Sequence, residues 1–209
     1  PCGGKLEIDG FAHHPYRYLR GTPASRDDVT YQVLGRLTAA LERIAKAKQI
    51  APGRPVYLTG FGVQSLPDEL FGVPVQRQLE ERARAERIAY ADPRVRAFSQ
   101  YLMRDDAERT GFDRFGGFQS GLRTAAGSAK RAYDGFRLPL VAERGRTRTT
   151  LWGLVMPAHG ATRVSIDYRP RGSRRWRFLK RDRTNGRGYW STATRLVSDR
   201  RYRVRWIAG

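Results

Sequence analysis

The sequence predicts an α/β fold of about three strand–helix units, followed by a small antiparallel β-sandwich. Helical periodicity alternates with short apolar strand patterns as far as residue 142, and it disappears after residue 148. Strand patterns lie at residues 5–11, 55–60 and 95–102, and helical patterns lie between them at residues 29–45 and 75–90. This alternation is typical of strand–helix–strand units with a parallel sheet.

The strand pattern at residues 55–60 organises the first part of the chain. Val56, Tyr57, Leu58 and Thr59 are apolar, aromatic or β-branched residues, which favours a strand that is buried on both faces. Gly60 ends the run. In α/β units, binding and catalytic groups lie where the strands pass into their following loops. We therefore expect functional side chains at the carboxyl ends of these strands.

The second part of the chain predicts a separate domain. Short strands alternate apolar with polar residues, as in an antiparallel sandwich of the immunoglobulin or fibronectin kind. Asn185-Gly186 is a strong signal for a hairpin turn. We assign residues 1–142 to the α/β domain, 143–148 to a linker and 149–209 to a basic β-sandwich. The expected interior residues of the sandwich are Trp152, Val164, Ile166, Phe178, Val204 and Trp206.

Positive charge is concentrated in the second part. The formal net charge is +20, and residues 143–209 contain 18 Lys and Arg against 4 Asp and Glu. Such a surface attracts polyanions, for example anionic glycans, cell-wall polymers or nucleic acid, although it could also be an arginine-rich solvated surface. Nucleic acid is the weaker option, because aromatic residues in a small sandwich more often form its core than stack on bases.

Length and cysteine content set further limits. The 209 residues suffice for one domain or one and a half, and the chain begins at Pro1, so we expect a fragment or a processed chain. No apolar run approaches the ~18 residues that a membrane span needs. Cys2 is the only cysteine, which excludes an internal disulfide.

Two adjacent histidines follow the first strand pattern. His13 and His14 precede Pro15 and Tyr16, and these residue types suit hydrogen bonding and stacking against a sugar. Plain packing of the loop is an alternative interpretation. Metal binding is a third, but no third ligand is evident, because His159 lies in the other module. We therefore predict neither a metal nor a cofactor.

Three segments resemble one enzyme group. The segment Pro55-Val-Tyr-Leu-Thr-x-Phe-Gly62 resembles the seventh strand of clan A retaining glycoside hydrolases, such as families 5 and 39. The segment from Asp9 to Tyr16 resembles the end of strand six in actinobacterial members, and Phe98 to Asp106 resembles strand eight. The resemblance covers roughly residues 2–142. It implies part of a (β/α)₈ (TIM) barrel, a poly- or oligosaccharide partner and a secreted or cell-surface location.

The resemblance also implies the roles of individual residues. The substrate-contacting positions would be His13, His14, Tyr16, Phe61, Gln64, Gln100 and Tyr101. The position of the catalytic nucleophile, a glutamate in that group, is occupied by Gly60. The acid/base glutamate of that group lies on strand four, which has no counterpart in this chain.

We therefore expect a glycoside hydrolase-like chain that does not hydrolyse O-glycosyl bonds by itself. The remaining acids of the first part, which include Asp105 and Asp106, are more simply structural or solvated. The alternative is a non-catalytic protein that binds carbohydrate or a polyanion through the basic second part.

Overall fold

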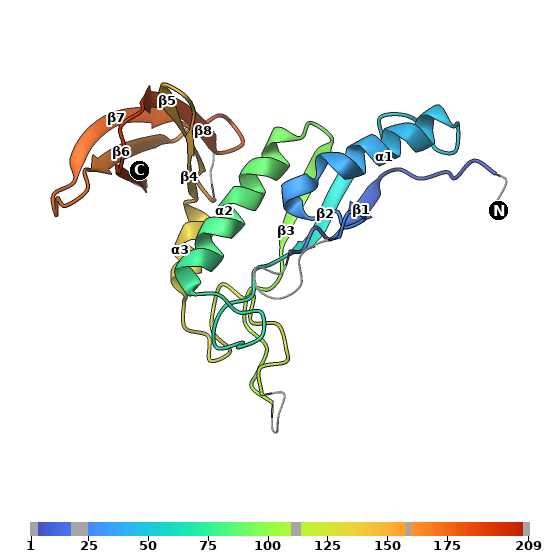
Figure 1. Ribbon diagram of the computed structural model, residues 1–209, viewed down its shortest axis with the longest axis horizontal. Coiled ribbons are helices and arrows are strands. Elements are labelled where there is room, and N and C mark those ends of the chain that lie inside the picture. Colours follow the sequence, from blue (N-terminus) through green and yellow to red (C-terminus); the bar gives the residue numbers. More distant parts are fainter. Residues whose placement is uncertain (1–3, 18–24, 110–113, 158–159, 207–209) are drawn as a thin grey trace. The chain divides into compact units, whose positions relative to one another are not determined.

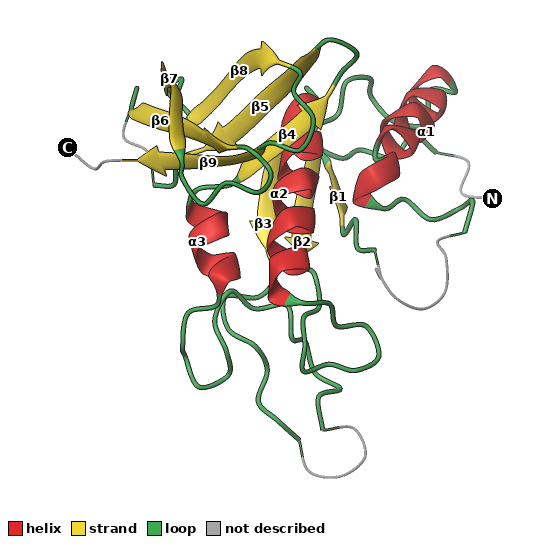
Figure 2. Cartoon of the chain, turned by 60° about the vertical axis from the view of Figure 1, so that its left-hand side comes forward, coloured by secondary structure: helices red, strands yellow, loops and turns green. Residues whose placement is uncertain are grey.

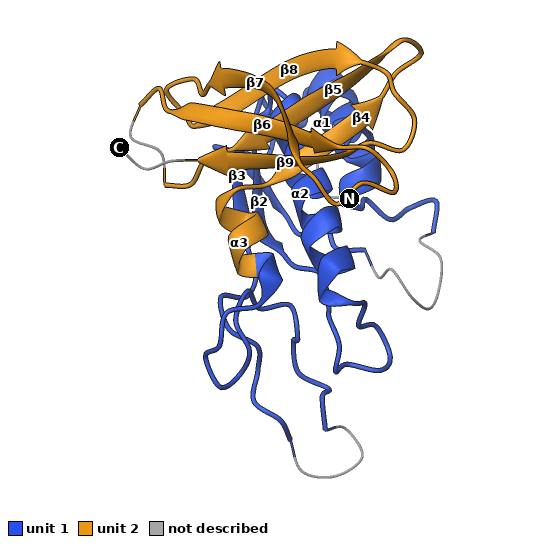
Figure 3. Ribbon diagram, turned by 90° about the vertical axis from the view of Figure 1, so that its left-hand side faces the viewer, with its two compact units in different colours: residues 1–132 blue, residues 133–209 orange. Residues whose placement is uncertain are grey.

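The chain divides into two compact units. The computed structural model describes residues 4–17, 25–109, 114–157 and 160–206. Unit 1 comprises residues 1–132 and unit 2 comprises residues 133–209 (Figure 3). Among the helices in the described ranges, none combines the length and the apolar character that a membrane crossing requires.

Unit 1 contains a three-stranded parallel sheet. Its strands are β1 (Phe11–His13), β2 (Val56–Phe61) and β3 (Val95–Gln100), and β2 pairs with both neighbours in the order β1-β2-β3. The parallel pairing and the chain order agree with the sequence-based expectation. The first strand is shorter and begins later than expected, because only Phe11, Ala12 and His13 pair with β2.

The helices of unit 1 pack on one face of this sheet (Figure 1). They are the short 3-10 helix η1 (Tyr31–Val33), α1 (Gly35–Lys46) and α2 (Val75–Ala91). Leu37 and Leu41 of α1 meet Val56 and Leu58 of β2 in one apolar cluster. The apolar stripe that the sequence shows at helical spacing is therefore the contact of α1 with the sheet.

The opposite face of the sheet differs from the prediction. Val56 and Leu58 are fully buried, but Tyr57 is 39% exposed and Thr59 is also exposed. The described helices thus bury one face of β2 and leave the alternate side chains in contact with solvent. The expectation that both faces are buried was wrong for these residues. A barrel would bury the second face, and it stays a prediction.

The inner face of α2 is unusually polar. Gln78, Glu81, Arg82 and Glu86 are all buried on this helix. Arg82 forms an ion pair with Glu86, and its Nε donates to Oε1 of Gln100 at 3.2 Å. Its guanidinium carbon lies 5.1 Å from the centroid of the Phe98 ring. Pairing of this kind is what allows charged side chains to lie inside a fold.

Unit 2 contains most of α3 (Arg131–Arg137) and, after it, two three-stranded antiparallel sheets. The sheets have the strand orders β4-β5-β8 and β7-β6-β9 (Figure 2). Leu151, Val155, Val164, Ile166 and Trp190 form a shared apolar core. The strands are β4 (Leu140–Arg144), β5 (Arg148–Leu154), β6 (Arg163–Arg169), β7 (Arg177–Arg183), β8 (Tyr189–Arg195) and β9 (Arg201–Trp206).

The segment expected to be a linker is a tight hairpin instead. Glu143 pairs with Thr150 and Arg144 pairs with Thr149, and the N–H of Gly145 donates to the carbonyl of Arg148 at 2.8 Å. Strand β4 therefore belongs to unit 2. Sequence periodicity did not indicate this strand, because Leu140 to Arg144 is only five residues long and its last three residues are exposed.

Two further expectations for unit 2 were wrong. Asn185-Gly186 connects β7 with β8, and these strands lie in different sheets, so the pair forms a turn between sheets and not a hairpin. Phe178 was expected inside but is 58% exposed. A register irregularity between Ile166 and Asp167 pairs Phe178 with Asp167, and this shift places the ring on the outer face. Trp152, Val164 and Ile166 are buried as expected.

Candidate functional site

The candidate site lies where β1 and β2 end. His14, Pro15 and Tyr16 directly follow β1, and Phe61 is the last residue of β2. Because the two strands are parallel and adjacent, their carboxyl ends meet at the same edge of the sheet. The backbone pairing thus brings the carboxyl ends of β1 and β2 to one edge of the sheet, where the sequence predicts functional side chains.

Side chains from the two strand ends contact each other. Nε2 of His14 and Oγ1 of Thr59 lie 3.0 Å apart, which is hydrogen-bonding distance. The His14 and Tyr16 rings meet edge to face at 5.9 Å between centroids, and the Tyr16 ring stacks near Phe61 at 6.2 Å. The result is a small polar and aromatic cluster of His14, Tyr16, Thr59 and Phe61, which we call the strand-end cluster. Phe61 is only 1% exposed and belongs to the apolar core, so it supports the Tyr16 ring from below and is not open to a ligand.

Gly60 lies inside this cluster. A Cβ atom added at Gly60 would lie 3.2 Å from the Tyr16 hydroxyl oxygen and 3.3 Å from Nε2 of His14. These are tight contacts, but both involve the far ends of side chains, which can move by a few tenths of an ångström. A side chain at position 60 would thus enter between one hydroxyl and one imidazole, which are groups that hydrogen-bond a carboxylate or a sugar hydroxyl.

His13 has a different role from its neighbour. Nε2 of His13 lies 2.7 Å from the carbonyl oxygen of Val29. This contact fastens the exit of β1 to the segment before η1, as in the loop-packing interpretation. Within the described parts of the chain, no three His, Cys, Asp or Glu residues gather in a way that could hold a metal ion.

The predicted residues after β2 and β3 form a second group. Gln100 accepts from Arg82, and its Nε2 donates to the carbonyls of Leu102 at 3.3 Å and Ser120 at 3.1 Å. Its amide is therefore engaged within the fold. Tyr101 is 37% exposed and its ring meets Phe118 edge to face at 5.1 Å. Gln64 reaches the same loop, where its Nε2 lies 3.5 Å from the carbonyl of Gly117.

Close backbone contact holds the ends of β2 and β3 together. The N–H of Tyr101 donates to the carbonyl of Phe61 at 2.8 Å. A Cβ atom added at Gly62 would overlap the carbonyl oxygen of Tyr101, at 1.8 Å, so any larger residue at position 62 would force the two strand ends apart.

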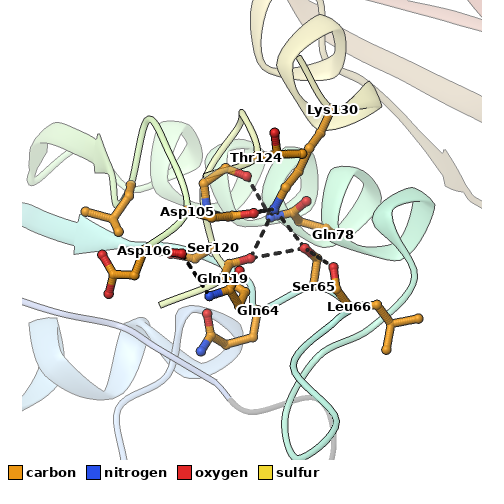
Figure 4. A network of polar contacts seen from close by, with 12 residues as sticks. Gln64, Ser65, Leu66, Gln78, Asp105, Asp106, Gln119, Ser120, Thr124 and Lys130 are labelled. Atoms are coloured by element: carbon orange, nitrogen blue, oxygen red, sulfur yellow. Dashed lines mark hydrogen bonds and ion pairs between the residues drawn. The ribbon is translucent and has the colours of Figure 1, made fainter. Parts of the chain in front are cut away.

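A buried polar network joins the loops that follow β2 and β3 (Figure 4). Nζ of Lys130 forms an ion pair with Asp105 at 2.6 Å and donates to Oγ of Ser65 at 2.9 Å and to the carbonyl of Gln119 at 3.3 Å. Oδ1 of Asp105 also accepts from the N–H of Gly121 at 2.8 Å. One ammonium group therefore connects the loops after β2 and β3 with the segment before α3.

Burial governs the electrostatics of this network. The side chains of Lys130 and Asp105 are 5% and 3% exposed. Burial raises the pKa of Asp105 and lowers the pKa of Lys130, although each group partly offsets the shift of the other. A carboxylate enclosed in this way cannot reach a substrate, so Asp105 is structural. No pattern in the sequence indicates the role of Lys130, since a single lysine before a short helix has no periodicity or motif of its own.

Comparisons with known proteins add little to this geometry. No protein-family model matches the chain, and no curated protein matches it. Among solved structures, it is similar to the Bacteroides uniformis beta-glucuronidase 2 covalently bound to cyclophellitol-6-carboxylate aziridine, with 12% sequence identity and a TM-score of 0.36. A crystal structure of Bacteroides uniformis beta-glucuronidase gives the same identity and TM-score. The matches cover 78% of this chain, and the chain spans about a fifth of those proteins, 21% of their length.

Proposed function

We propose that unit 1 is a carbohydrate-contacting part of a glycoside hydrolase-like (β/α)₈ domain and that it does not hydrolyse glycosides by itself. One observation carries the proposal: position 60 faces His14 and Tyr16 at the carboxyl end of a parallel strand. The motif around Thr59 and Gly60 resembles the nucleophile strand of clan A enzymes. The proposal includes the secreted or cell-surface location that this resemblance implies.

The chemistry of retaining hydrolysis explains the expected inactivity. Such enzymes use two carboxylates ~5 Å apart, one as nucleophile and one as acid/base. Gly60 supplies no carboxylate, and Asp105 is enclosed in its ion pair with Lys130. Oδ2 of Asp106 accepts from the N–H of Phe118 at 2.8 Å, so this acid holds the loop. What the strand-end cluster offers is hydrogen bonding and ring contact, which suit binding of a sugar without cleavage.

A carbohydrate titration of the full chain, monitored by NMR, tests the proposal. The ligands are aryl β-glycosides, and we expect weak binding that shifts the signals of His14, Tyr16 and Thr59, the members of the cluster that are not buried. His14→Ala and Tyr16→Phe should each weaken binding about fivefold. Tyr57→Phe is the matched control, since Tyr57 is a tyrosine near the start of β2, away from the strand-end cluster, and it should leave binding within twofold. If Tyr57→Phe weakens binding as much as Tyr16→Phe does, the strand-end cluster is not the binding site.

The charge of unit 2 favours a second candidate function, which is binding of polyanions. Residues 143–209 contain 18 of the 40 Lys and Arg residues but only 4 of the 20 Asp and Glu residues. Electrostatic attraction of this kind acts on any polymer with closely spaced negative groups and weakens steeply with salt. This function is independent of the strand-end cluster, because it involves the other unit.

A further inference from the structure

The outer face of the β7-β6-β9 sheet concentrates the arginines of unit 2. Val164, Ile166 and Val204 point into the core, so the alternate residues of the same strands point outward. Cross-strand pairing brings the outward residues together, for example Arg205 with Ser165 and Arg201 with Arg169. We call this surface the arginine face; its basic residues are Arg163, Arg169, Arg181, Arg183, Arg201, Arg203 and Arg205.

The arginine face contains a single acid at its paired positions. Asp167 lies in the middle of β6, opposite Arg203 on β9 and Phe178 on β7. Seven arginines thus share this surface with one aspartate. Neighbouring strands lie ~4.8 Å apart, and alternate residues along one strand lie ~7 Å apart. Positive groups at such distances repel one another, so the face is stabilised by any polymer that brings negative charge to it.

Asp167 fixes two of the arginines in place. Its Oδ2 accepts from Nε of Arg203 and from Nε of Arg205, both at 2.9 Å, and its Oδ1 accepts from Arg205 at 3.2 Å. The Asp167 side chain is 2% exposed, whereas those of Arg203 and Arg205 are 41% and 50% exposed. Burial alone would raise the pKa of Asp167, but the two arginines outweigh it and lower the pKa, so this carboxylate stays ionised.

Aromatic rings support the arginine face. The guanidinium carbon of Arg203 lies 4.6 Å from the centroid of the Trp176 ring, and that of Arg169 lies 4.9 Å from it. Arg203 is thus held by both a carboxylate and an indole. Half-exposed guanidinium groups in fixed positions lose little conformational entropy when they bind an anion, and their planar N–H donors match carboxylate and sulfate oxygens.

We propose that the arginine face binds a linear acidic polysaccharide, with the guanidinium groups of Arg203 and Arg205 at its centre. The inference rests on the second candidate function and deepens it, because it names a surface and a class of ligand. Charge complementarity carries it: the face offers fixed guanidinium groups in rows, and such a polymer carries its carboxylate or sulfate groups along its length.

The aromatic residues of the arginine face favour this polymer over nucleic acid. Single-stranded nucleic acid binds through open aromatic rings on which bases stack, combined with charge. Here two guanidinium groups lie over the Trp176 ring. Phe178 is exposed, but the guanidinium carbon of Arg181 lies 5.9 Å from its centroid. The surface therefore offers charge and directed N–H donors more than it offers a stacking platform.

Two matched variants of the full chain test the location. The face variant is Arg163→Gln/Arg181→Gln/Arg201→Gln, which removes three charges without touching Asp167. The turn variant is Arg144→Gln/Arg146→Gln/Arg148→Gln, which removes the same charge at the β4–β5 turn. We expect the face variant to lower the affinity for polygalacturonate and for heparin at least tenfold in ~0.1 M salt, and the turn variant less than threefold. Thermal melts must show that both variants fold.

Arg203→Lys tests the fixed guanidinium group. It keeps the charge but replaces the planar group that lies between Asp167 and Trp176. We expect about fivefold weaker binding of polygalacturonate, and unchanged affinity would contradict a role for guanidinium geometry.

The outcomes separate failure of the inference from failure of the second candidate function. If the unchanged chain binds neither polysaccharide and no single-stranded DNA, polyanion binding itself is wrong. If it binds them but the two triple variants lose affinity equally, the arginine face is not the site. Single-stranded DNA of equal charge should bind more weakly than heparin. If DNA binds more tightly than heparin and the face variant abolishes that binding, the ligand of the arginine face is nucleic acid and not a polysaccharide.

Discussion

The two units place their charged groups in opposite ways. Unit 1 buries the ion pairs Lys130–Asp105 and Arg82–Glu86, whose side chains are at most 6% exposed. Unit 2 has an apolar core, and its buried acid, Asp167, lies on the outer side of a sheet beneath two half-exposed arginines.

The different backbone arrangements explain this contrast. In unit 2, six strands pair in antiparallel ladders, which satisfy most backbone groups and leave the interior to apolar side chains. In unit 1, long loops follow β2 and β3, and a buried polar network joins them. Nζ of Lys130 donates to the carbonyl of Gln119 and to Oγ of Ser65, and the N–H of Ser65 donates to the same carbonyl. Buried charge in unit 1 therefore reinforces the few backbone contacts between these loops.

The largest expected effect comes from breaking the buried ion pair of unit 1. Lys130→Met leaves Asp105 buried without its partner, and removal of one member of such a pair costs about 3–5 kcal/mol. We expect the free energy of unfolding of unit 1, measured by urea denaturation at pH 7, to fall by this amount. The exposed pair Arg114–Glu108 is the control, since Arg114→Gln should cost less than about 1 kcal/mol.

A double variant sharpens this test. Lys130→Met combined with Asp105→Leu removes both charges and should recover most of the lost stability, because no unpaired ion remains in the interior. If Lys130→Met costs no more than Arg114→Gln, the network is not what fastens the loops of unit 1.

The next effect concerns alkaline pH and unit 1 alone. Burial, together with the hydrogen bond to Glu81, raises the pKa of Tyr31 from 10.0 to about 12. The folded chain thus keeps a proton that the unfolded chain loses above pH 10. Stability from this group is complete below pH 10 and is lost as the pH rises to about 12, by ~1.4 kcal/mol for each unit of the pKa shift.

Unfolding of Tyr31→Phe as a function of pH checks this expectation. Between pH 9 and 12, the stability of unit 1 should fall less steeply in Tyr31→Phe than in the unchanged chain. Tyr90→Phe removes the hydroxyl of a tyrosine that is 37% exposed and should leave the slope as it was. Identical slopes in all three chains would show that Tyr31 does not titrate as its burial requires.

A smaller effect is expected at acid pH and in unit 2 alone. Because the arginines lower the pKa of Asp167, its contribution is present above the unfolded pKa, near 3.8, and is lost as the pH falls through the folded pKa. Asp167→Asn should cost unit 2 about 1–3 kcal/mol at pH 7 and should reduce its acid sensitivity. Asp199→Asn, at an exposed position 3.7 Å from Arg171, should change neither. Thermal melts at pH 2 to 7 measure both.

Regular periodicity made much of the fold predictable. The long helical pattern at residues 75–90 agrees within one residue with α2. Features without a period were missed. Strand β4 is too short to show alternation, and the exposure of Phe178 depends on a register irregularity that only cross-strand pairing reveals.

The candidate site was predictable only in part. The sequence placed His14, Tyr16 and Gly60 at neighbouring strand ends. In the structure the rings of His14 and Tyr16 contact each other beside the space that a side chain at position 60 would enter. The sequence did not separate His13 from His14, because the contact of His13 with Val29 depends on how the chain folds back. The Asp105–Lys130 pair joins residues 25 positions apart across loops, so no local pattern indicates it.

The most direct test of the proposed function of unit 1 is hydrolysis of an aryl β-glycoside by the full chain with Gly60 and with Gly60→Glu. The new carboxylate would enter beside His14 and Tyr16, but retaining hydrolysis also needs an acid/base carboxylate, and none of the residues of the strand-end cluster is an acid. We expect no turnover above the buffer rate from either chain, while both retain their fold in thermal melts. Turnover by the unchanged chain that survives repurification would contradict the account, and its loss in Asp105→Asn would identify Asp105 as the catalytic acid that the buried ion pair with Lys130 excludes.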